Sequence, residues 1–98
     1  MSEPVITKRL VIHGRVQGVW YRGWTVDQAR ALGLAGWVRN RRSGTVEALL
    51  IGPAAKVREM IEACRSGPVA ARVKLIEEHP AGEDEVAAAA GFDQRPTL

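Results

Sequence analysis

The sequence predicts an α+β fold in which strands and helices follow one another in the order βαββαβ. Three observations lead to this prediction: apolar residues alternate in several short segments, two other segments carry apolar residues at helical spacing, and a short glycine-containing loop joins the two middle strands. A chain of 98 residues fits one domain with one modest core, so we expect residues 1–98 to form a single domain.

The first unit is a strand followed by a helix. The segment "KRLVIHG" alternates, with Leu10 and Ile12 on one face and Arg9, Val11 and His13 on the other. From about residue 21 to 32, helical spacing aligns a set of apolar positions, and Gly33 supplies a stop. These positions are Tyr21, Trp24 or Thr25, Ala29 and Leu32.

The middle of the chain predicts a hairpin. "GWVRN" and "TVEALLI" resemble two strands, and "RRSG" between them is a loop in which Gly44 can take a positive φ. Val46, Ala48 and Leu50 would share one face of the second strand, and Gly52 would end it.

The second unit starts at Pro53, which suits the first turn of a helix. The apolar stripe of that helix consists of Val57, Met60, Ile61 and Cys64, and the helix ends near "SGP". "ARVKLIEEH" alternates again through Val73 and Leu75 or Ile76, and "GFDQRPT" can supply a closing strand around Phe92. The acidic loop 82–90 lies between them, and its alanine run fits either a strand or a helical turn.

Two such units are typical of a ferredoxin-like sandwich, an antiparallel sheet with two helices on one face. This fold hosts many unrelated activities, so the function has to be argued from a site.

Charge is distributed unevenly along the chain, whose net charge is +3. Up to Gly52, eight Lys or Arg face three acids, and from Pro53 onward six face eight, which gives +5 and −2. A positive half attracts nucleic acid, anionic lipid or a small phosphorylated substrate, and charge does not choose among them.

The single cysteine, Cys64, excludes an intramolecular disulfide and a four-cysteine metal site. With no signal peptide or long apolar run, we expect a soluble cytoplasmic protein that does not bind a membrane.

The segment "GRVQGVWYR", residues 14–22, joins the first strand to the first helix. Free N–H groups of a first helical turn, and of a glycine-permitted curl before it, can converge on an anion. Gly18 lets the backbone approach an oxygen of the anion closely. The guanidinium of Arg22 can donate two parallel hydrogen bonds to two phosphate oxygens. An ordinary turn with a solvated arginine fits the local pattern equally well.

The same segment resembles the phosphate-binding signature of the acylphosphatase family, Gly-x-Val-Gln-Gly-Val-x-Phe/Tyr-Arg. All specified positions match: Gly14, Val16, Gln17, Gly18, Val19, Tyr21 and Arg22. The segment "GWVRNRRSGTVEALLIG" resembles the family's other pattern through Gly36, Trp37, Val38, Arg39, Asn40, Gly44, Val46 and Gly52. The resemblance covers most of the chain and is weakest in the acidic loop.

The resemblance implies a metal-independent hydrolase that cleaves an acyl phosphate into a carboxylate and inorganic phosphate. It implies that Arg22 binds the phosphoryl group together with the amides of the loop, and that Asn40 positions the attacking water. The loop residues are Arg15, Val16, Gln17, Gly18, Val19 and Trp20. It also implies a monomer without cofactor or metal, with inorganic phosphate as product and inhibitor.

Other residues have structural interpretations. We expect His13 and His79 to be strand or strand-end residues, Cys64 to lie in the core, and Trp37 to pack in the core or on the sheet. Asp27, Glu47 and the acids at 83–85 are expected to be solvated. Trp20 either lines the rim of the site or has no role there. Arg39, Arg41 and Arg42 form either a solvated hairpin surface or a patch that steers anionic substrate, and Arg15 has the same two interpretations.

Three other functions are compatible with this fold order or with part of the pattern, and the sequence argues against each. An RNA-binding module would carry aromatic residues on its central strands, and "TVEALLI" has none. A copper or zinc chaperone would need paired cysteines. An acylphosphatase-like module that binds carbamoyl phosphate would be the N-terminal part of a long chain, so a freestanding enzyme is favoured here.

Overall fold

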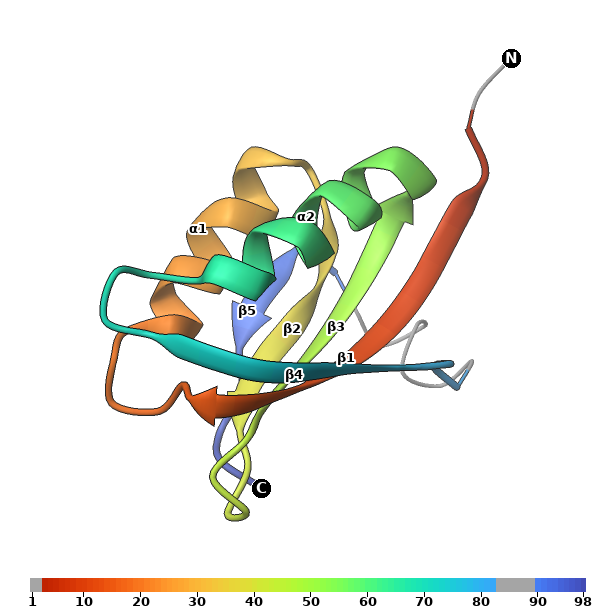
Figure 1. Ribbon diagram of the computed structural model, residues 1–98. Coiled ribbons are helices and arrows are strands. Elements are labelled where there is room, and N and C mark those ends of the chain that lie inside the picture. The colour runs from red at the N-terminus through yellow and green to blue at the C-terminus, as the bar shows by residue number, and fades with distance from the viewer. Residues whose placement is uncertain (1–2, 83–89) are drawn as a thin grey trace.

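A computed structural model describes residues 3–82 and 90–98. The strands are β1 (Val5–Arg15), β2 (Ala35–Asn40), β3 (Val46–Pro53), β4 (Arg72–His79) and β5 (Phe92–Gln94), and the helices are α1 (Tyr21–Ala31) and α2 (Ala54–Ser66). Both helices cover the same face of one twisted sheet (Figure 1). The acids at 83–85 and residues 87–89 of the alanine run lie outside the described residues.

The sheet has the strand order β4-β1-β3-β2-β5. The pairs β1–β3, β1–β4 and β2–β3 are antiparallel, and the ferredoxin-like α+β class is confirmed. One feature differs from the prediction of an antiparallel sheet, because β5 pairs with β2 in parallel. β4 forms one edge of the sheet, beside β1. The short strand β5 forms the other edge, beside β2, and runs in the same direction as β2.

The core lies between the sheet and the two helices. Leu10 and Ile12 of β1 face it, as the alternation predicted, and so does the whole predicted stripe of α2, including Cys64. On α1 the buried residues are Tyr21, Thr25, Val26 and Ala29, whereas Trp24 is only partly buried. The predicted face of β3 also packs into the core through Val46, Ala48 and Leu50.

Three predicted element boundaries are wrong, and one of them is Gly52, which lies inside β3 and does not end it. Gly14 does not end β1, which continues to Arg15, because a register shift between His13 and Gly14 lets the strand turn without stopping. Gly14 has φ +129°, and a Cβ there would lie 2.1 Å from the carbonyl oxygen of Arg72. Pro53 does not lie in the first turn of α2: its extended backbone ends β3, and the helix begins at Ala54.

The sheet face opposite the helices is also partly covered. Trp37 of β2 is only 1% exposed. The guanidinium carbons of Arg39 and Arg95 lie 4.5 and 5.1 Å from the centre of its ring. Trp37 therefore packs on the sheet, as expected, with two guanidinium groups over its ring.

Candidate active site

The loop between β1 and α1 forms one wall of a small cavity of about 140 Å³. Arg22, the second residue of α1, and Asn40, the last residue of β2, both line it, although 18 positions separate them in the chain. The described residues that line it are Val16, Gly18, Trp20, Tyr21, Arg22, Gly23, Asn40 and Gln94. The two predicted site residues thus meet at one cavity.

The loop curls because two of its residues have left-handed backbone conformations. Gly18 has φ +72°, as the glycine predicted, and Trp20 has φ +66°. A positive φ is uncommon for a residue with a side chain, and nothing in the sequence indicated it at Trp20. A Cβ at Gly23 would lie 2.2 Å from the indole Nε1 of Trp20, so the missing side chain of Gly23 makes room for that indole.

Gln17 fixes the loop to the hairpin between β2 and β3. Its side-chain amide donates hydrogen bonds to the carbonyl oxygens of Arg41 (2.8 Å) and Thr45 (2.9 Å). The side chain of Gln17 therefore binds the backbone of the hairpin and does not line the cavity. Its contacts hold the loop next to the end of β2, where Asn40 lies.

The other loop residues point in different directions. Val16 is buried in the core, and Val19 packs partly against it. Arg15 is exposed at the end of β1 and does not line the cavity. Trp20 is 64% exposed at the edge of the cavity, which supports its interpretation as a rim residue.

Asn40 has a free acceptor. Its backbone oxygen accepts a hydrogen bond from the N–H of Leu98 at 3.1 Å. Its side-chain oxygen Oδ1 is buried and has no hydrogen-bond partner among the described residues. Because buried polar atoms are nearly always paired, this oxygen is available to a ligand or a water in the cavity that Asn40 lines.

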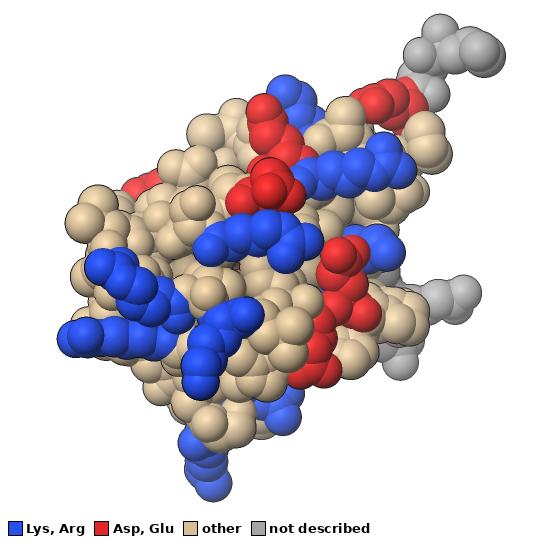
Figure 2. Space-filling view, viewed as in Figure 1, with Lys and Arg blue, Asp and Glu red and all other residues tan. Residues whose placement is uncertain are grey.

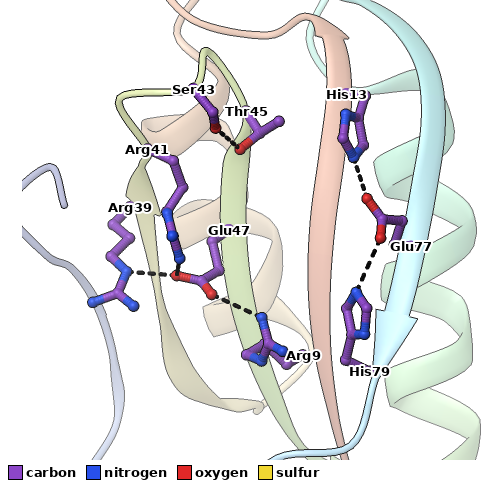
Figure 3. Close-up of polar contacts among 9 residues, drawn as sticks. All are labelled: Arg9, His13, Arg39, Arg41, Ser43, Thr45, Glu47, Glu77 and His79. Carbon is purple, nitrogen blue, oxygen red and sulfur yellow. Dashed lines mark hydrogen bonds and ion pairs between the residues drawn. The ribbon is translucent and has the colours of Figure 1, made fainter.

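Glu47 was expected on the solvated surface, and this prediction is wrong. Its side chain is 2% exposed and contacts three guanidinium groups on the open face of the sheet, from Arg9 (2.9 Å), Arg39 (2.6 Å) and Arg41 (3.2 Å) (Figure 3). Burial alone raises the pKa of the Glu47 carboxyl, but the hydrogen bonds and charge of the arginines outweigh it and hold the pKa below its usual value. Alternation along β3 places Glu47 on the face opposite Val46 but does not indicate that arginines bury it there.

The same contacts constrain the predicted basic patch. Arg39 and Arg41, on either side of Asn40, are held by Glu47, so they are not a freely solvated surface. Arg42 is exposed, and its backbone N–H donates to the carbonyl oxygen of Leu98 at 3.0 Å. The hairpin next to Asn40 is therefore tied both to the sheet and to the end of the chain.

His13 and His79 are strand residues, as expected, but β1 and β4 bring them together. Both rings hydrogen-bond the carboxylate of Glu77, one on each oxygen (Figure 3). The hydrogen bond from His13, with a smaller contribution from His79, lowers the pKa of Glu77 below its usual value. This cluster lies on the open face of the sheet and does not line the cavity.

Two neighbouring groups have raised pKa values: Tyr21, which lines the cavity, and Cys64, which does not. The Tyr21 hydroxyl donates to the carbonyl oxygen of Cys64 at 2.6 Å, and burial raises the Tyr21 pKa far above its usual value. Burial likewise raises the pKa of the Cys64 thiol to about 12. Both groups are therefore neutral near pH 7, and Cys64 is not activated as a nucleophile.

Figure 2 shows Lys and Arg side chains gathered toward the end of the molecule where β1 meets the loop, with acidic side chains farther along the sheet.

No group of three or more His, Cys, Asp or Glu suited to a metal ion occurs among residues 3–82 and 90–98. In the same part of the chain, no helix has the length and apolar character needed to cross a membrane.

Sequence reasoning missed two residues of the cavity wall. Gln94 reaches it from β5, and no motif or periodicity marked this short terminal strand as part of a site. Gly23 directly follows Arg22, but a glycine in the first turn of a helix has no specific meaning without the neighbouring indole.

Comparison with known proteins gives a consistent assignment. The family model described as acylphosphatase matches residues 8–93. An acylphosphatase from Rhodospirillum rubrum is 56% identical over 87 residues, which are 89% of this chain and 92% of the relative. The crystal structure of acylphosphatase from Bacillus subtilis superposes with a TM-score of 0.81 at 32% identity and covers 94% of this chain and 99% of that one.

A weaker likeness concerns the fold alone. The crystal structure of T. kodakarensis HypF matches with a TM-score of 0.78 at 22% identity, over 90% of this chain but only 11% of the HypF chain. The curated relatives, in contrast, match this chain over most of their length at about 50% identity. The chain belongs to the acylphosphatase family and is a hydrolase that acts on acyl phosphates.

Proposed function

We propose that the 140 Å³ cavity is the active site, in which Arg22 and the loop amides bind the phosphoryl group and Asn40 orients the attacking water. The observation that carries this proposal is the meeting of Arg22, the curled loop and the unpaired Asn40 oxygen at one cavity. The reaction is metal-independent hydrolysis of the carboxyl-phosphate bond.

Binding of the phosphoryl group follows from the loop geometry. Successive backbone N–H groups around left-handed residues form a concave nest for anions, and the first turn of a helix adds further free N–H groups. Here Gly18 and Trp20 are left-handed, and α1 begins at Tyr21. The Arg22 guanidinium supplies two parallel donors for phosphate oxygens and neutralises charge on the transferring group.

Hydrolysis needs an oriented water but no side-chain base. Among the described residues, the cavity lining contains no carboxylate, imidazole or thiol, and its one phenol, Tyr21, is neutral. The side-chain oxygen of Asn40 accepts a hydrogen bond from the water and directs its oxygen at phosphorus. The new P–O bond forms as the bond to the acyl oxygen breaks, the carboxylate leaves, and the water proton passes to a phosphate oxygen.

We also propose that residues 1–98 act as one domain and as a cytoplasmic monomer, on a small molecule and not on nucleic acid or a membrane. The central strand β3 carries no aromatic residue for base stacking, which argues against an RNA-binding surface.

The test is hydrolysis of an aromatic acyl phosphate in excess chelator. We expect wild-type activity to persist, and Arg22→Gln and Asn40→Ala each to lower turnover by about 100-fold or more, the usual cost of losing a donor or a positioning group at the reacting centre. Arg58→Gln, an exposed arginine on α2, is the matched control and should stay within twofold. Loss of wild-type activity on chelation, or retained activity in both site variants, would contradict the proposal.

A further inference from the structure

A second, larger hollow of about 390 Å³ adjoins the proposed phosphate site. It lies between the start of α1 and the segment that joins α2 to β4, and we name it the apolar groove. Its lining is Val19, Trp20, Trp24, Gly67, Pro68, Val69 and Ala70. We infer that the apolar groove holds the acyl group of the substrate, so that the enzyme favours acyl phosphates with an aromatic or long aliphatic acyl group. This inference rests on the proposed function.

Trp20 connects the two hollows. It lines both the cavity and the apolar groove, so one indole forms part of both walls. In an acyl phosphate a single oxygen joins the phosphorus to the acyl carbon, so the acyl group must begin at the edge of the phosphate cavity. A substrate with its phosphoryl group beside Arg22 therefore places its acyl group within reach of the Trp20 side chain.

The chemistry of the apolar groove selects an uncharged occupant. None of its seven lining residues carries a charged side chain. Of the five large hydrophobic residues that are exposed in the described part of the chain, two line this groove, Trp20 at 64% and Val69 at 96% exposure. Exposed apolar surface next to a polar site is typical of a ligand groove, because binding removes it from water.

The groove is also built with a fixed shape. Gly23 leaves space for the Trp20 indole, and Gly67 lets the segment after α2 approach Tyr21, since a Cβ there would lie 2.6 Å from the Tyr21 ring. The Tyr21 and Trp24 rings lie 5.4 Å apart between their centroids and support one another. The strained backbone of Trp20 is thus maintained by its surroundings, as is common for residues that position a ligand.

Another hollow of about 330 Å³ is less suitable for an acyl group. Arg9, His13 and Arg41 line it, together with Val11, Ser43 and Thr45. It is on the side of the sheet that bears Glu47, and it shares no lining residue with the phosphate cavity. An apolar acyl group would have to lie among guanidinium groups there, at a cost in desolvation.

The test compares kcat/KM for benzoyl phosphate and acetyl phosphate in wild type and Val69→Ser. Val69 is almost fully exposed, so the substitution does not disturb folding, and it lies outside the phosphate cavity. We expect the ratio of benzoyl to acetyl phosphate to fall by about threefold to tenfold in Val69→Ser, because an apolar contact made only by the larger acyl group is lost. Comparison of ratios cancels the different intrinsic reactivities of the two substrates.

The matched control is Val5→Ser, an exposed valine at the opposite end of β1 from the loop, which should leave the ratio unchanged. A ratio in Val69→Ser equal to that of the control overturns the acyl-group inference while the proposed function stands. A wild-type protein that hydrolyses neither substrate overturns both. A wild-type dimer that Val69→Ser converts to a monomer would assign the groove to a second copy of the chain and overturn the inference.

Discussion

Replacing Glu47 by alanine removes the carboxylate that holds three arginines on the open face of the sheet. A hydrogen bond between charged groups contributes about 1.5 to 3 kcal/mol to stability, so three would give about 5 to 9 kcal/mol if they were independent. The guanidinium side chains are 20–39% exposed and regain water when the carboxylate is lost. We therefore expect a smaller loss, about 3 kcal/mol, at the lower end for breaking a buried ion pair.

The assay is urea unfolding followed by tryptophan fluorescence. With a slope of about 1 to 3 kcal/mol per molar, a loss of about 3 kcal/mol lowers the midpoint by roughly 1 to 3 M. Glu78→Ala is the matched control, because Glu78 lies on the same sheet and, within the described part of the chain, its one ion pair is an exposed one with Lys8, at 3.7 Å. We expect that substitution to cost less than about 1 kcal/mol.

The pH dependence gives an independent check through Glu47→Gln. The folded-state pKa of Glu47 lies below its usual value of 4.5, so the carboxylate adds stability above the unfolded pKa and loses it as the pH falls through the folded pKa. The difference in unfolding free energy between wild type and Glu47→Gln should be constant near neutral pH and shrink below about pH 4.5. A loss below about 1 kcal/mol in Glu47→Ala, or a difference that grows on acidification, would refute this reasoning.

Three further predictions concern the backbone, the single tyrosine and the loop. Gly36→Ala should leave the protein unfolded at room temperature, as measured by circular dichroism, because the added Cβ would lie 1.8 Å from the carbonyl oxygen of Leu49. Gly44→Ala is the comparison: Gly44 has φ +95° but open space around it, so the substitution should lower the free energy of unfolding by only about 1 kcal/mol. Because burial raises the pKa of Tyr21, the only tyrosine, absorbance at 295 nm should not change near pH 10 and should change only when the protein unfolds in alkali. Gln17→Ala should weaken inhibition by inorganic phosphate about tenfold, because the loop loses both hydrogen bonds to the hairpin, and unchanged inhibition would exclude this tie as a positioning contact.

Periodicity predicted most of the fold because local pattern and tertiary burial agree. The stripe from Val57 to Cys64 and the alternation around Leu10 and Ile12 are both buried as predicted. The parallel pairing of β5 was not predicted, since a three-residue strand carries no periodicity and its partner is 56 positions away, as in the pair Gly36 and Phe92.

The candidate site was predicted through motif resemblance, which named Arg22 and Asn40, and the fold brings both to one cavity. The contacts that fix them depend on residues distant in sequence and could not be predicted. Gln17 was assigned to the loop by pattern, but its partners are carbonyl oxygens of Arg41 and Thr45, which no side-chain motif can reveal. An isolated acid such as Glu47 is usually solvated, and its three arginine partners become apparent only when the strands are paired.

The most direct test of the proposed division of roles is the affinity for inorganic phosphate, measured by isothermal titration calorimetry on the Asn40→Ala variant. If Asn40 orients the water and Arg22 with the loop binds phosphate, Asn40→Ala should bind phosphate within about threefold of wild type, although its turnover falls about 100-fold. Arg22→Gln should lose most of the affinity in the same titration. Equal loss of phosphate affinity in the two variants would contradict the account, because Asn40 would then belong to the phosphate site itself.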